Sequence, residues 1–520
     1  MNRRSFISFL GTGMALAPGV PSLLSSCTSG GRDYLNQPLK GIAPGAKDEL
    51  TLADGLSYDI ISKWGDPLSE NLKFGYNNDY LAYLPQGPKE GLLWVNHEYV
   101  NPILCSGYDP AKARLRAQIE SEMEEVGGSL IKLKKDKKWQ IVHGHPSNDR
   151  LTGSQKIPFE WQERVGNATE ATGTLANCSG GVTPWGTILT CEENYDFFYG
   201  EKNFDDGSYQ ASELQWEVFF PKNRTEHYGW VVEYDPASKT AKKHIALGRF
   251  AHECATVQAL DDGRVVIYSG DDKNGGCLFK YISAEPEKIS PGTLYVGNFE
   301  TGTWESLDMD KAALNERFGS ETEMLIRARE AAIRVGGTPL DRPEDIEIDP
   351  LDGSILVALT NNIPNENYFG SILKIKEESG YDGLRFSWDT YLTGGEETGF
   401  ACPDNLAFDA GGNLWFTSDI SGSSLNASPY TAFGNNGLFV FIREGINAGR
   451  VIQMASAPND AEITGPCFLP DGTLLLSIQH PGETSASPSQ LTSNWPDGPG
   501  NLPKSAVVAV YGDFLEDISS

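Results

Sequence analysis

Histidine is scarce in this sequence, which contains only seven among 520 residues. That number argues against a zinc site built mainly from imidazole ligands. The sequence also has no GxxxxGK[ST] phosphate loop, no HExxH helix and no GxSxG elbow, so it lacks the usual signatures of P-loop proteins, zinc peptidases and α/β-hydrolases. The ligands available for a metal are carboxylates, carboxamides and cysteine thiolate. Oxygen ligands favour Ca²⁺, and a thiolate among them indicates a transition metal such as iron.

Basic residues are also few: 42 lysines and arginines stand against 71 aspartates and glutamates, for a formal net charge of −29. This acidity argues against nucleic acid as a partner and permits binding of hard cations. It also repels an anionic substrate, unless a bound metal reverses the sign of the charge locally. No stretch reaches the roughly 18 consecutive apolar residues of a transmembrane helix.

The N-terminus has the pattern of an export signal. A twin-arginine sequence, Arg3-Arg4-Ser5-Phe6-Ile7, precedes an apolar run over 9–20 that glycine and proline interrupt. Leu24-Ser25-Ser26-Cys27 then has the form of a lipoprotein cleavage site, although Cys27 could be incidental to a plain cleaved signal. We therefore predict a Tat-type signal peptide over 1–26, a linker over 27–47 and one catalytic domain over 48–520. Export by the Tat machinery would place the protein in the periplasm or at the cell surface, with a lipid on Cys27 as its membrane attachment.

The cysteine count leaves room for a metal ligand. Eight cysteines are present, and seven remain without Cys27. An odd number means that at least one is free or bound to something other than cysteine. If Cys178 binds a metal, the other six could form up to three disulfides or none.

One pattern recurs along the chain: a glycine-containing turn leads into an apolar strand, and the strand ends in polar, often acidic, residues. Six such units lie at 91–98, 185–193, 262–272, 352–362, 411–419 and 471–480. Six units of this kind predict an all-β fold, a six-bladed β-propeller with insertions, and a pair of β-sandwiches is the alternative. Helical spacing of apolar residues predicts helices over 111–126 and 311–335, whereas 146–160 and 421–435 are expected to be long loops.

The segment 171–194 contains the strongest candidate for a site. It holds Cys178, a Gly-Gly pair, a Thr-Pro-Trp turn and a strand that ends in Glu192-Glu193. It could be no more than a glycine-rich turn with a buried cysteine and an acidic strand end. On a propeller, however, polar residues at strand ends point toward one central axis, so they become candidates for one shared cluster.

Further candidates lie at other strand ends. His252-Glu253 precedes an apolar strand, and Asp341-Arg342-Pro343-Glu344-Asp345 follows the second predicted helix. Pro343 should keep Arg342 extended and so place Arg342 and Glu344 on the same side of a strand. An arginine beside a carboxylate ligand suits a metal site that also binds an oxyanion, although a surface ion pair is the simpler reading. Asp271 and His480 lie at the ends of other units, and Asp404 lies in a further polar turn at 400–405.

Several of these motifs together resemble the PhoX-type alkaline phosphatases. The motifs are NCSGGVTPWGTILTCEEN at 177–194, HE at 252–253, DRPED at 341–345, NHEY at 96–99 and QHPGE at 479–483. The resemblance implies a six-bladed propeller with an iron and calcium cluster, Fe³⁺ and Ca²⁺, on its axis. It implies that Cys178 binds iron, that Glu193, Glu253 and Glu344 bind metal, and that Arg342 is catalytic. Glu192, Asp271 and Asp404 are further candidate metal ligands, and His480 is a weaker candidate.

These observations predict a metal-dependent phosphomonoesterase that releases inorganic phosphate from small organic esters. Arg342 would hold the phosphoryl oxygens as charge shifts in the transition state. One alternative is a calcium-dependent propeller lactonase or phosphotriesterase, which does not need a cysteine ligand. Another is a lipid-anchored propeller that only binds its partner. We expect a monomer that does not bind nucleic acid.

Overall fold

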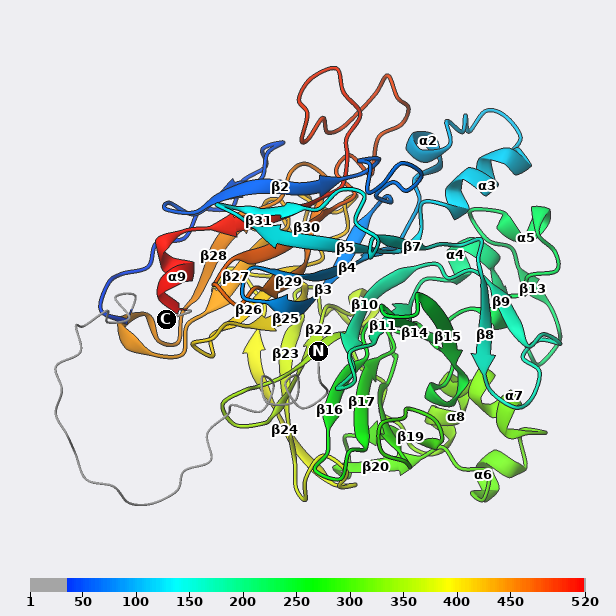
Figure 1. The fold of residues 1–520 in the computed structure, drawn as a ribbon. Helices are drawn as coiled ribbons and strands as arrows, with labels where there is room; N and C mark the ends of the chain where they lie inside the picture. Colours follow the sequence, from blue (N-terminus) through cyan, green and yellow to red (C-terminus); the bar gives the residue numbers. More distant parts are fainter. Residues whose placement is uncertain (1–34, 519–520) are drawn as a thin grey trace, which may run out of the picture.

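The computed structural model describes residues 35–518 and shows a six-bladed β-propeller (Figure 1). The innermost strands of the blades contact one another in chain order and close into a ring, because the first and last of them also touch. The predicted signal peptide over 1–26 lies outside the described residues.

Each blade is built on consecutive antiparallel strands, the first of which is innermost, and only β8 of the second blade joins its neighbour β15 in parallel among the described strands. The first blade contains β3 (Asn78–Gly87), β4 (Glu90–His97), β5 (Gly127–Lys135), β6 (Trp139–Ile141) and β7 (Asp149–Leu151). The second contains β10 (Asn177–Val182), β11 (Ile188–Glu192), β14 (Val231–Asp235) and β15 (Thr240–His244), extended by β8 (Lys156–Glu160) and β9 (Glu170–Thr172). The third contains β16 (Thr256–Ala259), β17 (Val265–Gly270), β18 (Leu278–Ser283), β19 (Gly292–Asn298) and β20 (Thr303–Ser306).

The fourth blade contains β21 (Pro343–Ile348), β22 (Ile355–Leu359), β23 (Ser371–Glu377) and β24 (Phe386–Thr393). The fifth contains β25 (Pro403–Phe408), β26 (Leu414–Ser418), β27 (Gly437–Phe441), β28 (Val451–Ser456) and β1 (Thr51–Leu52). The sixth contains β29 (Glu462–Phe468), β30 (Leu474–Gln479), β31 (Ala506–Tyr511) and β2 (Ser57–Lys63). A separate hairpin joins β12 (Glu201–Lys202) to β13 (Tyr209–Gln210). The second strand of every blade is one of the six units predicted from the sequence.

The sixth blade is built from both ends of the chain. Strand β2 pairs antiparallel with β31, from Ser57 opposite Tyr511 to Lys63 opposite Ala506, and the two strands lie side by side in Figure 1. The blade is therefore complete only when the N-terminal segment is in place, which ties the start of the described chain to its end.

The hydrophobic core is divided among the interfaces between neighbouring blades. Buried side chains of the third and fourth blades pack together, for example Val266 and Tyr268 with Ile346 and Val357. Equivalent clusters fill the other interfaces of the ring. This burial of apolar area removes the faces of every sheet from water and holds the blades in a fixed arrangement around the axis.

The innermost strands all begin at the same end of the propeller, which we call the mouth end. Because the second strand of a blade is antiparallel to the first, it finishes at the mouth end as well. The starts of six strands and the ends of six others are therefore gathered around one opening. The N-terminal segment begins at the opposite end: Asn447, in the turn between β27 and β28, donates a side-chain hydrogen bond to the carbonyl of Gln37. From there the chain runs to the mouth end, where Asn435 donates to the carbonyl of Gly45.

The two predicted helices are present but shorter than expected. The segment 111–126 contains only α3 (Arg116–Met123), because Asp109 caps a turn over Ala111 and Leu115 is extended. The segment 311–335 is split into α6 (Ala312–Asn315), α7 (Glu321–Ile326) and α8 (Ala328–Arg334). The break before α7 follows Gly319, and Ser320 caps the new helix by accepting from the Glu323 N–H. These breaks were not apparent from the apolar spacing.

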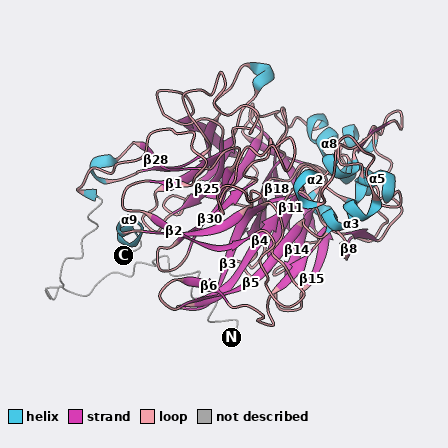
Figure 2. Ribbon diagram, turned by 90° about the horizontal axis from the view of Figure 1, so that it is seen from above, coloured by secondary structure: helices cyan, strands magenta, loops and turns pink. Residues whose placement is uncertain are grey.

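The other short helices are α2 (Pro102–Cys105), α4 (Asp196–Tyr199), α5 (Trp216–Phe219) and α9 (Asp513–Ile518). Single 3-10 turns lie at Thr225–His227, Ile245–Leu247, Ile363–Asn365 and Gly445–Asn447. Helices α2, α3, α5 and α8 gather on one side of the ring, as Figure 2 shows. None of the helices in residues 35–518 has the length and apolar character needed to cross a membrane.

Two further expectations can be compared with the structure. The expected loop over 146–160 contains β7 and β8, so that expectation was wrong, whereas 421–435 contains no helix or strand. All seven cysteines of the described chain are free thiols. None of the three possible disulfides is therefore formed among residues 35–518.

Candidate metal centre

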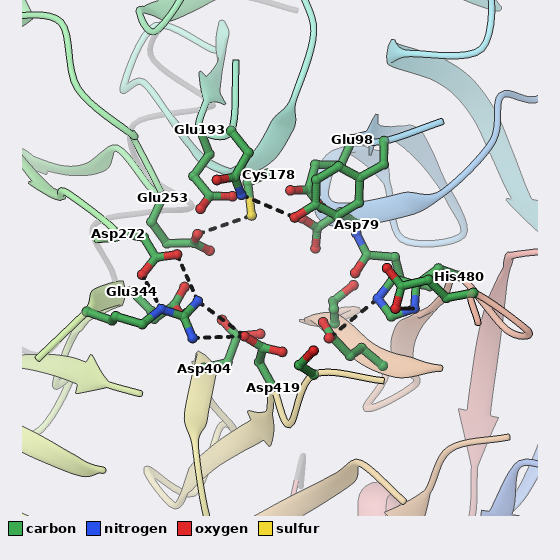
Figure 3. Close-up of a pocket in the computed structure, with 18 residues that line it drawn as sticks. Asp79, Glu98, Cys178, Glu193, Glu253, Asp272, Glu344, Asp404, Asp419 and His480 are labelled. Atoms are coloured by element: carbon green, nitrogen blue, oxygen red, sulfur yellow. Dashed lines mark hydrogen bonds and ion pairs between the residues drawn. The ribbon is translucent and has the colours of Figure 1, made fainter. Parts of the chain in front are cut away.

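A cavity of about 210 Å³ lies on the propeller axis at the mouth end. Figure 3 shows the labelled side chains pointing into it from the surrounding blades. Its polar lining consists of Asp79, Glu98, Tyr99, Cys178, Glu193, Asn194, Glu253, Asp272, Arg342, Glu344, Asp404, Asp419, Ser421, Glu462, Thr464, Gln479, His480 and Glu483. Ten of these residues are carboxylates and only one carries a guanidinium. The cavity is thus strongly acidic.

Four of the cavity side chains are aimed by the same backbone device. Asp79, Cys178, Glu344 and Asp404 are each the second residue of an innermost strand, and each lies in a β-bulge with one extra residue. The residue just before each of these strands has a left-handed backbone, with φ between 50° and 54°. A bulge re-aims a side chain relative to the regular pleat, and here it turns the second residue toward the axis.

The ends of the second strands are tied to these same left-handed residues. The backbone N–H of Glu98 donates to the carbonyl of Asn77, and Glu193 donates to Ala176 in the next blade. In the fifth blade, Asp419 donates to Cys402 in the same way. Each such bond places a carboxylate from a strand end beside the bulged residue of the neighbouring strand, so the two sets of side chains meet in pairs.

Three groups of potential metal ligands lie side by side in the cavity. They are Asp79 with Glu98 and Cys178, then Cys178 with Glu193 and Glu253, and then Glu253 with Glu344 and Asp404. Within each group, the ligand atoms lie within 4.8 Å of one another. Cys178 and Glu253 each belong to two groups, and the Cys178 thiol donates to Glu253 Oε2 at 3.1 Å. The groups therefore form one continuous array.

The free oxygens of the array fit bound cations. Asp79 Oδ1, Glu98 Oε1 and Glu253 Oε1 are buried without any hydrogen-bond partner. Leaving a buried carboxylate oxygen unpaired is costly, and a metal ion removes that cost. The residues of the array are oxygen donors plus one thiolate, a set that can hold both hard cations and a transition metal.

Burial and mutual repulsion oppose ionisation of these side chains. Burial together with the nearby Asp79 raises the pKa of Glu98 to about 8, and burial raises the pKa of Asp79 to about 6. Burial raises the pKa values of Glu193 and Glu253 well above the usual range, with neighbouring carboxylates as further causes. Carboxylates at this density can all be ionised together only when positive charge is placed among them.

Arg342 lies at the edge of the array. Its Nε and Nη2 donate to the two carboxylate oxygens of Asp272 at 2.8 and 2.9 Å. Nη2 also lies 2.7 Å from Glu344 Oε1, although outside hydrogen-bonding geometry, and 3.3 Å from Asp419 Oδ2. Arg342 and Glu344 face the same cavity as expected, but for a different reason than the sequence suggested. Arg342 has φ 54° and is not extended, and the bulge after Pro343 turns Glu344 toward the arginine.

Two expected ligands do not join the array. Glu192 is fully buried on the other face of its strand, where Lys243 Nζ donates to it at 2.6 Å. Successive residues of a strand point to opposite faces, so Glu193 reaches the cavity and Glu192 does not. Asp271 is likewise paired with Arg329, at 2.6 Å from its Nη2. Cys178, Glu193, Glu253, Glu344, Asp404 and His480 all line the cavity.

Six carboxylates of the cavity were not predicted as site residues: Asp79, Glu98, Asp272, Asp419, Glu462 and Glu483. Three of them, Glu98, Asp272 and Asp419, stand at or near the ends of units already identified in the sequence, so position alone could have singled them out. Asp79 is the second residue of the innermost strand β3, and Glu462 is the first residue of the innermost strand β29. No motif in the sequence distinguishes those two carboxylates from ordinary surface residues.

Comparison with known proteins agrees with this geometry. Residues 38–482 match the family model described as alkaline phosphatase PhoX. The chain is similar to the solved structure of Pseudomonas fluorescens PhoX in complex with vanadate, a transition state analogue, with 28% identity and a TM-score of 0.80 over 92% of this chain and 98% of that chain. A Trypanosoma rangeli sialidase aligns over 90% of this chain and 61% of its own, but its 10% identity and TM-score of 0.37 carry no argument. No curated protein matches the sequence.

Proposed function

This chain belongs to the PhoX family of alkaline phosphatases, and we propose that it hydrolyses phosphate monoesters in the axial cavity, with metal ions bound by the array around Cys178. The products are inorganic phosphate and the alcohol of the ester. The observation that carries the proposal is the continuous array of metal-ligand groups with the guanidinium of Arg342 at its edge.

The charge of the cavity explains why metal is needed. Ten carboxylates and one guanidinium line it, so a phosphate dianion would be repelled by the protein groups alone. Bound metal ions would neutralise the phosphoryl oxygens and act on them as Lewis acids. Cys178 with Glu193 and Glu253 would hold Fe³⁺, because a thiolate favours a transition metal. Glu253, Glu344 and Asp404 offer only oxygen and would suit Ca²⁺.

Arg342 would bind the phosphoryl group of the ester. Asp272 holds one edge of the guanidinium through two hydrogen bonds, whereas the contacts of Nη1 and Nη2 with Asp419 are longer, at 3.4 and 3.3 Å. The phosphoryl oxygens would replace Asp419 at these nitrogens, which are already aimed by the pair with Asp272. A planar guanidinium fixed in this way suits phosphate, because it can donate two parallel hydrogen bonds.

We further propose that the protein is exported by the Tat route and anchored by a lipid on Cys27. The support is the twin-arginine sequence and the Leu24–Cys27 segment, both outside the described residues. A Cys27→Ala variant expressed with the full signal should move from the membrane fraction to the soluble extracytoplasmic fraction. Retention of the variant in the membrane fraction would contradict the anchor.

The test of function combines elemental analysis with an activity assay on the same purified sample. The protein should contain iron and calcium and release phosphate from β-glycerol phosphate. Cys178→Ala should lose iron and at least about 100-fold in kcat/KM, on the scale of a lost catalytic electrostatic contact. Cys277→Ala is the matched control, because Cys277 is a buried free thiol that does not line the cavity.

Other results for activity and metal content would contradict specific parts of the proposal. Full activity in Cys178→Ala would overturn the role of the thiolate. Calcium without iron, together with turnover of lactones or phosphotriesters, would identify a different hydrolase. No turnover with both metals supplied would indicate a propeller that only binds its partner.

A further inference from the structure

A second cavity, of about 390 Å³, opens beside the axial one, and we propose that it binds the organic half of the ester and favours an uncharged aromatic group there. This inference rests on the proposed phosphatase function. It adds the class of ester that the same site prefers. We call this second cavity the side pocket.

The walls of the side pocket are mainly apolar and aromatic. They include Tyr99, Val100, Ile103, Tyr108, Phe197 and Leu214. These residues come from the segment that follows β4, from α4 and from the loop before α5. The side chain of Phe197 is 37% exposed, whereas most large apolar side chains of the propeller are buried. A large apolar side chain left exposed in a concave site is available to contact a ligand.

The side pocket is continuous with the axial cavity. Tyr99, His480 and Glu483 line both of them. Tyr99 directly follows Glu98 of the metal-ligand array, and its hydroxyl accepts a hydrogen bond from Asn194 Nδ2 at 3.1 Å. Its ring packs edge-on to that of Phe197, with centroids 6.4 Å apart. A phosphoryl group in the axial cavity therefore has an aromatic wall next to it on this side.

The charge of the side pocket selects among possible ester groups. Glu213 and Glu483 are among its lining residues, and no lysine or arginine is. A second anionic group on the substrate would meet these carboxylates without a cation to pair with. Its size suits a small ring, because pockets for small ligands begin at about 300 Å³. An uncharged aryl group can pack against the apolar walls and is not repelled by the two carboxylates.

The test compares benzyl phosphate with ethyl phosphate, whose leaving alcohols are similarly basic. The wild-type holoenzyme should hydrolyse benzyl phosphate with the higher kcat/KM. Phe197→Ala should lower kcat/KM for benzyl phosphate about tenfold, the scale of one apolar contact, and change that for ethyl phosphate less than about twofold. Tyr209→Ala is the matched control, because Tyr209 is 47% exposed and does not line the pocket.

A charged analogue tests the second half of the inference. Wild type should discriminate against 4-carboxybenzyl phosphate relative to benzyl phosphate, and Glu213→Gln should reduce that discrimination by about two- to threefold, as expected for an exposed charge. Glu213 is exposed and lies outside the metal-ligand array.

The outcomes separate this inference from the proposed function. Equal kcat/KM for benzyl and ethyl phosphate in wild type, or equal losses for both in Phe197→Ala, would overturn the side-pocket inference and leave the phosphatase intact. Failure of wild type to release phosphate from either ester would overturn the phosphatase function, and the inference with it. An unchanged preference in Glu213→Gln would overturn the selection by charge.

Discussion

The guanidinium of Arg342 is bound through two nitrogens to both carboxylate oxygens of Asp272, at 2.8 and 2.9 Å. Asp272 follows β17 in the third blade, whereas Arg342 precedes β21 in the fourth. The pair therefore connects two blades across the edge of the cavity. The two hydrogen bonds fix the plane of the guanidinium in the absence of a ligand.

This geometry predicts that Asp272 is a positioning residue for Arg342. Asp272→Asn removes the charge and one acceptor of the pair, so the guanidinium should lose its orientation. We expect kcat/KM for β-glycerol phosphate to fall about 10- to 100-fold, the scale of a hydrogen bond to a charged group, with metal content retained.

The adjacent carboxylate supplies the control. Asp271→Asn weakens the ion pair with Arg329, away from the cavity, and should leave kcat/KM within about threefold while lowering stability. Arg342→Lys should resemble Asp272→Asn, since an ammonium cannot form the two parallel bonds. Equal kinetics in Asp272→Asn and wild type would show that the pair does not orient the arginine.

The neighbours Glu192 and Glu193 should behave in opposite ways when each is changed to glutamine. Glu193 lies in the metal-ligand array, so Glu193→Gln should reduce metal content and activity. Glu192 forms a fully buried pair with Lys243. Removing its charge leaves the ammonium of Lys243 uncompensated, at a cost of about 3–5 kcal/mol in the free energy of unfolding.

Elemental analysis and chemical denaturation of both variants decide the matter. Glu192→Gln should keep its metals when folded but unfold at a lower denaturant concentration. Loss of metal in Glu192→Gln, without loss of stability, would return Glu192 to the list of ligands.

Metal removal should make stability depend on pH in a defined direction. In the metal-free protein the pKa values of Asp79 and Glu98 are raised to about 6 and about 8. In the unfolded state both carboxyl groups lose their protons near pH 4. In the folded state Asp79 keeps its proton up to about pH 6, and Glu98 keeps its proton up to about pH 8. Across that range the free energy of unfolding falls as pH rises, by at most about 1.4 kcal/mol per pH unit for each proton.

Thermal unfolding in a chelator should thus show a Tm that decreases between pH 5 and pH 8. Added calcium and iron should raise Tm most at pH 8, because the ionised carboxylates then bind cations in place of protons. A chelated protein whose Tm rises over this interval would contradict the acidic array as the source of the effect.

The sequence predicted the propeller because each second strand carries its own turn, apolar run and polar end. The unit at 185–193 brought Glu193 to the axis, whereas Cys178 and Glu253 were singled out by the motifs around them. Asp79 could not be found in this way, because a β-bulge in β3 turns it toward the axis. Glu462 could not be found either, because its place depends on which strand of the blade is innermost. Both features are set by pairing between strands and not by local sequence. Arg342 shows the same limit: Pro343 suggested an extended backbone, but Arg342 has φ 54°, and its carbonyl accepts a hydrogen bond from the Thr360 N–H. Glu192 was named as a candidate ligand but points away from the cavity, because the face of a strand to which a residue points depends on register.

The path of the N-terminal segment has a consequence for how esters reach the enzyme. The described chain starts beside the turn between β27 and β28, at the end of the propeller farthest from the mouth, as the contacts of Gln37 with Asn447 place it. The lipid proposed on Cys27 would therefore attach to the described chain at the end opposite the mouth. The mouth would then not be the attached end, and esters from the surrounding fluid could reach it without passing the point of attachment.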